Sequence, residues 1–526
     1  MFRTLYPTLT AMRRDLPRLA ESRFDLLVIG AGIYGACAAW DASLRGLSVA
    51  VVDRTDFGAG TSANSLRIVH GGLRYLARGD FSRMRESIKE RSTLLRIAPN
   101  LVQPLEILVP TYGSGTRGRL AHAAALRLND LVSFSRNRHL DRSHQLKSGH
   151  LVSRQECLAS FPWFPAEGLT GGAVWHDAQL RHPERLTLSF IRSAATIGAV
   201  PLNYLQVDHL LVANGTVQGA QATDLLTGAQ MEILARAVLV AGGPWTDEIL
   251  ATAGTRDSEA GTRGAQAMGL NLVVNRRLAK VGIGVQSRSG PQEDTVCGGQ
   301  RFLFCAPCGR GTVLGTWYTG DIADPVAAHA RGVRALLQEF NDACPGLKLS
   351  QADVIRSQWG WLPLKSGREP GRPGALAERP RITDHGPEGI KRLISVEGVK
   401  FTTARLVAEQ AIDRVFTSLG RPSPVCLTAE RKLDNGAAEP PPGDAAGLGR
   451  EDIVRAVRQE MAVKLSDVVL RRAGFGVAPA PARATVEAAA RVMAAELGWD
   501  AFREGEEIQG VLREHYPFGT ALETVA

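Results

Sequence analysis

The first fifty residues contain a glycine-rich turn that connects an apolar run to an alanine-rich, helix-prone segment. Residues 24–29 have the composition of a buried parallel strand, and residues 36–45 favour a helix. A second apolar run, residues 48–52, ends at an aspartate. Strand, turn, helix, strand and terminal acid together predict a βαβ unit that binds a dinucleotide. The residues of this motif are Gly30, Gly32, Gly35 and Asp53.

Each glycine of the turn has a physical role in such a unit. Gly30 permits a tight turn, Gly32 lets a diphosphate approach the backbone, and Gly35 lets helix and strand pack closely. The helix N-terminus presents unpaired N–H groups and about half a positive charge to the diphosphate. Asp53 is placed to hydrogen-bond the ribose hydroxyls, which argues against a ligand with a 2′-phosphate.

The segments that follow favour FAD over a nicotinamide dinucleotide. A loop of small residues comes soon after Asp53, where a nicotinamide domain would continue with further βα units. Late in the chain, a second glycine turn and a threonine pair precede a predicted helix at 404–415, which provides a second anion-binding helix N-terminus. A ligand held at both places is long, as FAD is. The further candidate cofactor residues are Thr61, Ser62, Gly71, Gly72, Gly243, Gly398, Lys400, Thr402 and Thr403.

Charge and cysteine content exclude several classes of protein. The net charge is +9, but the excess is spread along the chain. Because no basic stripe is interleaved with aromatic residues, we expect no nucleic-acid partner. The seven cysteines are odd in number and widely spaced, which argues for a reducing compartment. Cys305 and Cys308 form a close pair, but the apolar runs around them predict a β-hairpin, and we expect no metal site.

The N-terminal region and the hydropathy pattern bear on location. No window approaches eighteen consecutive apolar residues, so we expect no transmembrane helix. Residues 1–23 contain scattered arginines and no apolar core of a signal peptide. This lead-in is either a short surface helix or a weakly amphipathic helix lying on a membrane. We expect a cytoplasmic protein. Peripheral contact with the inner face of the cytoplasmic membrane and a homodimer stay open.

The predicted fold class is α/β: an FAD-binding, Rossmann-like, doubly wound domain with an inserted β-rich substrate domain and a C-terminal helical domain. Residues 24–434 form the FAD-binding and substrate domain, and apolar runs at about 265–365 form the β-rich insertion. Residues 435–449, which include three consecutive prolines, read as a linker. Residues 450–526 form the helical domain, with helical periodicity over 453–470 and 484–497.

Several longer strings resemble the FAD-dependent glycerol-3-phosphate dehydrogenase family. The most specific are His-Gly-Gly-Leu-Arg-Tyr at residues 70–75 and Asp-x-x-Leu-Arg-Arg at residues 467–472. The strings at 242–245 and 398–403 match as well, and the resemblance covers nearly the whole chain. It implies oxidation of glycerol 3-phosphate to dihydroxyacetone phosphate, transfer of the electrons to quinone or oxygen, and association with one face of a membrane.

Three strings depart from that family. A family Lys-Gly-x-His string reads Met-Gly-Leu-Asn and ends at Asn271. A family Gly-Thr-Thr-Asp string reads Gly-Thr-Trp-Tyr and ends at Tyr318. A family Gly-x-Arg-Pro string has Leu362 in place of the arginine expected to hold the substrate phosphate. The three departures lie on the substrate side and leave the flavin site intact. Replacement of an arginine that holds a phosphate with two hydrogen bonds is not a conservative change.

Oxidation of an alcohol by a flavin requires hydride transfer from carbon to flavin N5 and a group that accepts the hydroxyl proton. With Asn271 at the family's histidine position, the expected base is missing. His70 is a candidate base, and a structural histidine beside the flavin is the alternative. The resemblance places Arg74 and Tyr75 in the substrate pocket and Lys400 near substrate and flavin. The candidate catalytic residues are therefore His70, Arg74, Tyr75 and Lys400.

Three hypotheses for function follow. The first is an FAD-dependent dehydrogenase that oxidises glycerol 3-phosphate or a related anionic alcohol, with quinone or another electron acceptor. The second is an amine, amino-acid or 2-hydroxy-acid oxidase on the same scaffold, since a neutral amine needs no strong base. The third is a flavin-binding interaction protein whose catalysis has decayed.

Overall fold

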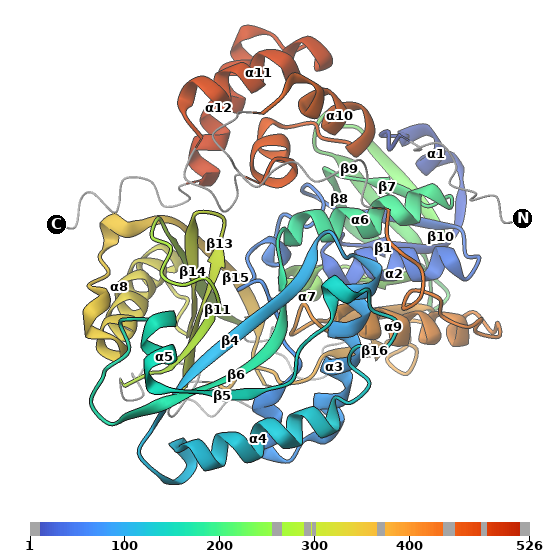
Figure 1. The fold of residues 1–526 in the computed structure, drawn as a ribbon. Helices are drawn as coiled ribbons and strands as arrows, with labels where there is room; N and C mark the ends of the chain where they lie inside the picture. The colour runs from blue at the N-terminus through green and yellow to red at the C-terminus, as the bar shows by residue number, and fades with distance from the viewer. Residues whose placement is uncertain are drawn as a thin grey trace, which may run out of the picture.

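The computed structural model describes residues 11–254, 266–288, 296, 301–365, 374–434, 448–474 and 481–515. Two β-sheets lie side by side in this part of the chain, and a group of helices packs on one end (Figure 1). The linker predicted at 435–449 lies outside the described residues apart from 448 and 449. The mixed α/β architecture with a helical C-terminal region confirms the predicted fold class.

The first sheet contains the predicted βαβ unit. Strand β1 pairs in parallel with β2 and β10, and parallel pairing continues to β7 on one side and β17 on the other. The strands of such a sheet are covered on both faces and therefore read as continuous apolar runs. The sheet contains β16 (Arg381–Asp384), β17 (Leu393–Glu397), β10 (Gln230–Val240), β1 (Arg23–Ile29), β2 (Val49–Val52), β7 (Val200–Leu202), β9 (Thr216–Asp224) and β8 (Leu205–Ala213).

Three helices from distant parts of the chain cover one face of this sheet. Helix α2 follows the glycine turn and packs against both α6 and α9. Their apolar sides join the sheet in one core that includes Trp40 and Phe190, whose rings meet edge to face. The covering helices are α2 (Ile33–Leu44), α6 (Pro183–Thr196) and α9 (Ala404–Ser418). The long-range packing of α9 on α2 brings the end of the sheet-forming region back to the glycine turn.

The second sheet is largely antiparallel and has nine strands. The range 265–365 supplies five of them, and Cys305 and Cys308 lie in the predicted hairpin of β13 and β14. Four strands come from earlier in the chain and widen the sheet beyond that range. The strands are β15 (Val354–Pro363), β11 (Gln266–Val274), β14 (Gly311–Thr319), β13 (Phe302–Cys308), β12 (Gly282–Gln286), β4 (Val102–Tyr112), β6 (Leu169–Leu180), β3 (Ile68–Val69) and β5 (His150–Val152).

The remaining helices outside the C-terminal region surround the two sheets. Helix α8 packs on β14 of the second sheet, and α4 lies at the margin of the molecule, far from the C-terminal helices (Figure 1). These helices are α3 (Phe81–Ile97), α4 (Arg119–Val132), α5 (Arg154–Ser160), α7 (Thr246–Ala251) and α8 (Pro325–Ala343). Short 3₁₀ turns near the glycine-rich segments are η1 (Thr61–Ala63), η2 (Leu73–Arg78) and η5 (Gly243–Trp245).

The described part of the lead-in packs on the first sheet. Helix α1 (Leu16–Glu21) contacts β10, and Leu19 is fully buried there. Arg14 forms an ion pair with Asp224 at the end of β9. The apolar side of α1 therefore faces the protein core, as the surface-helix interpretation expects, and contact of the lead-in with a membrane stays a prediction. Residues 1–10 lie outside the described residues.

The C-terminal region has its own apolar core, built from α10 (Arg450–Glu460), η8 (Asp467–Arg472), α11 (Arg483–Leu497) and α12 (Ala501–His515). The predicted continuous helix over 453–470 is wrong. Helix α10 ends at Glu460 because Met461 adopts a left-handed conformation with φ 56°. Asp467 then accepts hydrogen bonds from the backbone N–H groups of Val463 and Lys464, at 2.9 Å each, and stabilises the turn between the two segments.

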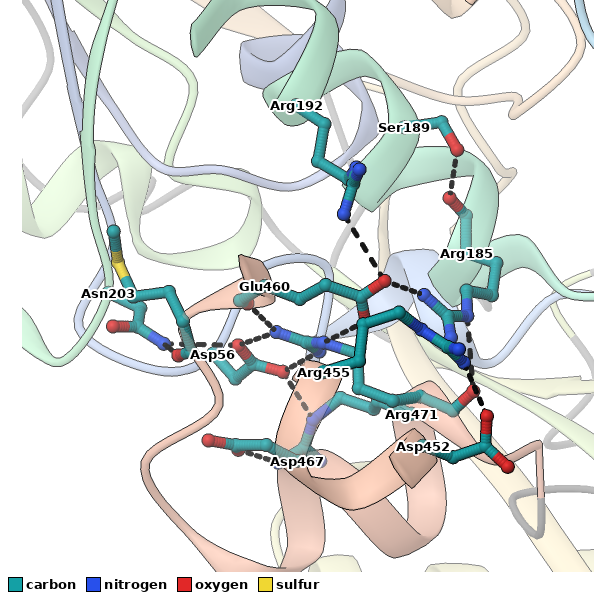
Figure 2. Close-up of polar contacts among 12 residues, drawn as sticks. Asp56, Arg185, Ser189, Arg192, Asn203, Asp452, Arg455, Glu460, Asp467 and Arg471 are labelled. Atoms are coloured by element: carbon teal, nitrogen blue, oxygen red, sulfur yellow. Dashed lines mark hydrogen bonds and ion pairs between the residues drawn. The ribbon is translucent and has the colours of Figure 1, made fainter. Parts of the chain in front are cut away.

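A buried ionic network joins this helical region to the nucleotide-binding sheet (Figure 2). Asp56, three residues after the predicted ribose-binding acid, is fully buried and accepts hydrogen bonds from Arg471 at 2.8 Å and Arg472 at 2.5 and 2.9 Å. Glu460 accepts from Arg185 and Arg192 of α6, at 2.7 and 3.3 Å. Every charge in this network faces an opposite charge, as buried ions require.

Candidate functional site

The glycine turn has the geometry that the sequence predicts. Gly30 has φ +97°, and a Cβ there would lie 2.5 Å from the carbonyl oxygen of Ala241. A Cβ on Gly35 would lie 1.8 Å from the carbonyl oxygen of Gly30, so strand and helix approach too closely for any side chain. At Gly32 the nearest atom to a Cβ is the Ser62 hydroxyl, at 3.2 Å. The first and third glycines are thus required by the protein itself, and the second leaves the start of α2 open.

Asp53 and Ser62 lie directly beside this turn. One oxygen of Asp53 accepts a hydrogen bond from Ala31 N at 2.7 Å, and the other accepts from the backbone and hydroxyl of Thr55 at 2.8 Å. Burial raises the pKa of Asp53, and these hydrogen bonds oppose the shift. The Ser62 hydroxyl accepts from Ile33 N at 3.0 Å, at the N-terminus of α2. The structure therefore brings the acid, the serine and the helix start together.

A second turn approaches from the other end of the chain. The Tyr34 hydroxyl donates to the Lys400 carbonyl at 2.7 Å and accepts from the N–H groups of Val399 and Lys400 at 3.1 Å. A Cβ on Gly398 would lie 2.0 Å from the Tyr34 ring. Tyr34 thus fixes the turn at 398–400 against the start of α2. Thr402 and Thr403, both buried, lead into α9 next to this contact.

The glycine pair Gly71 and Gly72 is explained by packing. Gly71 N donates to Asp177 at 2.6 Å, and a Cβ on Gly71 would lie 2.2 Å from the Arg91 guanidinium. Arg91 in turn pairs with Asp177 at 2.5 Å. Gly72 has φ +81°, and its Cβ would lie 2.6 Å from the ring of Tyr75. Both glycines are needed to seat η2, and a direct cofactor contact for either stays a prediction.

Thr61 and Gly243 lie on two further turns of the region. The Thr61 hydroxyl accepts from Trp361 N at 3.3 Å and donates to its carbonyl at 3.4 Å, which ties η1 to β15 of the second sheet. Gly243 is exposed, has φ +57°, and opens η5 at the end of β10. Thr61 thus lies where the two sheets meet, and a cofactor contact for Gly243 stays a prediction.

Tyr75 lies at the centre of a group of cations. Lys400 donates a hydrogen bond to the Tyr75 hydroxyl, and Arg74 donates to the same oxygen at 3.2 Å. Lys400, Arg83 and Arg74 also lie over the Tyr75 ring, 4.5, 4.8 and 5.1 Å from its centre. Arg83 pairs with Asp80 and Glu378. Among the described residues, neither Arg74 nor Lys400 forms an ion pair with a carboxylate.

His70 lies next to this group, with its ring 6.1 Å from that of Tyr75. Burial lowers the pKa of His70 to about 3, and Arg74 adds to the shift. Its Nδ1 is buried and has no hydrogen-bond partner in the described part of the protein. His70 is therefore neutral at pH 7. Its low pKa means that the imidazole binds a proton weakly, so His70 is a weak base. The site thus contains a histidine poorly suited to the role that the sequence suggested for it.

Comparison with known proteins places this geometry in a family. Residues 25–414 match the family model described as "FAD dependent oxidoreductase", and residues 401–504 match the "C-terminal domain of alpha-glycerophosphate oxidase". A glycerol-3-phosphate dehydrogenase of Synechocystis is 32% identical over 447 residues, which cover 81% of this chain and 76% of the relative. This chain belongs to the FAD-dependent glycerol-3-phosphate dehydrogenase family. It is therefore an FAD-dependent oxidoreductase.

Two further members show the range of the family. The human mitochondrial glycerol-3-phosphate dehydrogenase is 30% identical over 409 residues, and the match covers 74% of this chain but only 52% of that longer protein. The crystal structure of a Bacillus halodurans glycerol-3-phosphate dehydrogenase complexed with FAD has a TM-score of 0.69 and covers 95% of this chain and 96% of that one, at 24% identity. The structural similarity shows that the fold is shared.

The residues of the first turn fit FAD. The open face at Gly32 and the N-terminus of the twelve-residue helix α2, where the Ser62 hydroxyl accepts from Ile33 N, suit a diphosphate, and Asp53 lies at the end of the adjoining strand. The N-terminus of α9 and the Nδ1 of His70, which has no partner among the described residues, offer further polar groups. FAD, when bound, supplies the acceptor for a hydride. The family-level cofactor prediction is thus confirmed, while the individual contacts stay predictions.

The three strings that depart from the family meet in space. They lie on β14, β11 and β15, which are neighbours in the second sheet, and Gly269 pairs with Tyr318 on one side and Gly360 on the other. Asn271 is buried, donates to the Asn64 carbonyl at 3.1 Å and accepts from Thr316 at 2.7 Å. An amide with both ends bonded does not replace a histidine base. The departures therefore change one connected region.

Two features of the site were not predicted from the sequence. Tyr34 occupies a variable position of the glycine motif, and nothing local shows that it will bond a turn more than 360 residues away. The pairing of Arg91 with Asp177 joins α3 to β6, and it explains Gly71 only once both are placed. A tyrosine inside a Gly-x-Gly-x-x-Gly motif is unusual in size, and that size was the available hint.

Proposed function

We propose that the protein oxidises glycerol 3-phosphate, or a closely related small anionic alcohol, to the corresponding ketone, and passes the electrons from FAD to quinone or another acceptor. The observation that carries the proposal is a pair of cations beside the flavin-binding elements, Arg74 and Lys400, for which the described ranges contain no carboxylate partner. Cations left unpaired at a site attract and orient an anionic ligand. Arg74 is exposed and Lys400 is half-buried, so both are within reach of a ligand.

The altered second sheet limits how the phosphate can be held. Leu362 cannot replace the arginine of the family, and it lies on β15 opposite Ala267. Arg74 then carries most of the anion binding, and the protein should discriminate less sharply than the family between phosphate and other anions. This supports glycerol 3-phosphate as the first substrate to test and related anionic alcohols as the next.

The test is anaerobic bleaching of the flavin by glycerol 3-phosphate and by uncharged glycerol. In Arg74→Gln, we expect kcat/KM for the phosphate ester to fall roughly tenfold to hundredfold, the loss of about 1.5–3 kcal/mol from a hydrogen-bonded charge, and kcat/KM for glycerol to change little. Arg78→Gln is the matched control, because Arg78 lies on the same turn but pairs with Glu378. A flavin that no anionic alcohol bleaches would refute the proposal.

A second function is favoured by one observation. Asn271 replaces the histidine base of the family, and oxidation of a neutral amine needs no such base. An amine, amino-acid or 2-hydroxy-acid oxidase on this scaffold would release hydrogen peroxide when supplied with its substrate and oxygen. Peroxide release from an amine or amino-acid panel, with no reaction toward glycerol 3-phosphate, would decide for this alternative.

The exposed face of α4 supports a peripheral membrane contact, where a quinone would be available. Leu120 and Leu131 of α4 are 88 and 70% exposed, and Phe134, two residues past the end of the helix, is 83% exposed. Large exposed apolar side chains gathered on an amphipathic helix and the turn after it are typical of a segment that lies in a membrane interface. No helix in the described ranges is long and apolar enough to cross a bilayer.

Vesicle binding tests this surface. The double variant Leu120→Ser/Phe134→Ser should lose co-sedimentation with vesicles of equal parts phosphatidylcholine and phosphatidylglycerol, while oxidation with a soluble dye is kept. Phe502→Ser on α12, which removes an equally exposed side chain elsewhere, is the control and should bind as the parent does. Equal binding by parent and double variant would refute the contact.

A further inference from the structure

The hydroxyl of Tyr75 has two charged donors and no acceptor of its own among the described residues. Lys400 approaches from the turn before α9, and Arg74 approaches from η2 at 3.2 Å. A phenol oxygen that accepts hydrogen bonds from two cations is stabilised more as a phenolate than as a neutral phenol. Tyr75 itself is buried, with only 2% of its surface exposed, whereas Lys400 is half-buried and Arg74 is exposed.

These positions make Lys400 and Tyr75 a pair that shares protons. Their atoms are hydrogen-bonded, and two ionisable groups in direct contact lose and gain protons as a unit. One proton short of full protonation, the pair is either a neutral amine beside a phenol or an ammonium beside a phenolate. In both forms it takes up one proton and becomes an ammonium beside a phenol.

We propose that Lys400 and Tyr75 together form the proton acceptor of the reaction, in the role that a histidine has elsewhere in the family. The inference rests on the proposed function as an alcohol dehydrogenase. As the substrate O–H bond breaks, its proton bonds to Lys400 Nζ. If Lys400 is already an ammonium, it passes one of its own protons to the Tyr75 oxygen at the same time. Bound FAD would accept the carbinol hydride, so that the alcohol would lose one proton and one hydride and become the ketone.

The charges around the pair favour the proton-deficient form. Burial lowers the pKa of Lys400, and Arg74 and Arg83 lower it further, while Tyr75 opposes the shift. Burial alone would raise the pKa of Tyr75, but Arg74 and Lys400 outweigh it and the net shift is downward. Arg83 is partly neutralised by Asp80 and Glu378 on the far side. The other neighbours of Tyr75 in the described part of the protein carry no charge: His70 is neutral, and Met84, Ile88 and Val132 are apolar.

Tyr34 offers a matched comparison within the same site. Its hydroxyl also bonds residue 400, but to the backbone rather than to the ammonium group. Burial raises the pKa of Tyr34 to about 12, and hydrogen bonds to the turn at 399–400 only partly oppose this. The pKa of Tyr75 is therefore expected to lie below that of a free phenol, and the pKa of Tyr34 above it. Only Tyr75 contacts the ammonium group of Lys400.

The test is a spectrophotometric titration of the holoenzyme in the ultraviolet, where phenolate absorbs. Subtracting the absorbance of Tyr75→Phe from that of the parent removes the contribution of the flavin. The difference should show one phenolate that forms with a pKa below the value of about 10 for free tyrosine. The difference between parent and Tyr34→Phe should show none in that range. Lys400→Gln should move the Tyr75 signal to higher pH. A Tyr75 signal that appears at or above that of free tyrosine, or that Lys400→Gln leaves in place, would overturn the pair.

Kinetic constants distinguish two roles for Tyr75, as part of the proton acceptor or only as a support that positions Arg74. Tyr75→Phe keeps the ring under the cations and loses only the hydroxyl, so kcat should fall by about 10²–10⁴ with little change in KM. The acid limb of the kcat/KM profile should follow the pKa from the titration. A rise in KM with kcat intact would instead make Tyr75 a support for anion binding and refute the pair. Because the titration needs no substrate, its outcome is independent of which alcohol is oxidised.

Discussion

Two regions of the molecule gather arginines, and they handle the charge in opposite ways. Around Asp56, the guanidinium groups of Arg471 and Arg472 are buried, and each forms an ion pair with a carboxylate at hydrogen-bond distance. Figure 2 shows Arg471 beside Asp56 and Asp467. Around Tyr75, Arg74 and Lys400 share a phenol and have no carboxylate partner in the described ranges. The first region balances its charge within the protein. The second leaves positive charge for something else to balance.

The difference separates a structural network from a ligand site. Buried ions must be paired, and a network complete in itself has no capacity left for a ligand. Cations that remain unpaired beside a cofactor cost stability and are kept where they bind or move charge. The Asp56 network therefore joins the nucleotide-binding sheet to the C-terminal helices, and the Tyr75 group is the place where, in our proposal, the substrate anion and its proton are bound.

The largest effect should come from breaking the balance at Asp56. Asp56→Asn keeps the shape of the side chain and leaves Arg471 and Arg472 facing a neutral group. Loss of one partner from a buried ion pair costs about 3–5 kcal/mol of unfolding free energy. Urea unfolding of parent and variant at pH 7 measures the loss, and a change below about 1 kcal/mol would contradict the structural reading.

Two further variants sharpen this result. Asp56→Asn/Arg471→Gln removes one charge of each sign, so it should recover part of the lost stability in a double-mutant cycle. Arg483→Ala, which breaks an exposed pair with Glu487 on α11, should cost no more than about 1 kcal/mol. The contrast shows that burial, rather than the presence of an ion pair, sets the size of the effect.

The parts that the sequence predicted well are those set by local backbone chemistry. The glycine spacing alone required a tight turn, an open helix start and a close strand–helix contact, and Gly30, Gly32 and Gly35 have these roles. The hairpin at Cys305 and Cys308 followed in the same way from two apolar runs and a glycine turn. Such features depend on neighbours within a few residues, so a single sequence is enough to identify them.

The parts that were missed depend on distant pairs. Nothing around Asp56 indicates that residues more than 400 positions later will neutralise it. The end of α10 is held by distant contacts: the Met461 carbonyl accepts a hydrogen bond from Asn203 at 2.9 Å, and Glu460 accepts from Arg185 at 2.7 Å. These tertiary contacts override a good helical period. The sequence suggests His70 as a candidate base because Asn271 stands at the family's histidine position, and it leaves a structural histidine as the alternative. The burial of His70 beside Arg74 reverses the first expectation, and no local pattern shows burial of this kind.

The next effect is smaller and depends on pH. His182 precedes α6 and contacts the C-terminal region, where a Cβ on Gly474 would lie 2.6 Å from its ring. Burial lowers the pKa of His182 to about 3, and nearby Arg67 and Arg185 add to the shift. The unfolded chain binds a proton below about pH 6.5 and the folded chain does not, so this stability is present above pH 6.5 and is lost as pH falls toward 3.

At pH 5 the loss from His182 should be about 2 kcal/mol relative to pH 7. The glutamine of His182→Gln cannot take up a proton. Between pH 7 and pH 5, the unfolding free energy of this variant should therefore fall by about 2 kcal/mol less than that of the parent. His209→Gln, an exposed position on β8, is the control and should fall as the parent does. If His182→Gln and parent lose equal stability, the histidine is not held neutral at this joint.

The smallest expected effect on stability concerns the group around Tyr75, and its sign is more informative than its size. Lys400→Met removes a half-buried cation whose pKa is lowered by burial and by Arg74 and Arg83, so the folded protein should become more stable by about 0.5–2 kcal/mol. Unfolding of the flavin-free protein at pH 7 measures this without the contribution of bound FAD. Lys365→Met, which breaks an exposed pair with Glu378, should stay within about 0.5 kcal/mol of the parent.

A gain in stability together with lost activity would mark Lys400 as a residue kept for chemistry. A loss of several kcal/mol would place it with Asp56 among the residues that hold the fold, and the distinction between the two regions would fail.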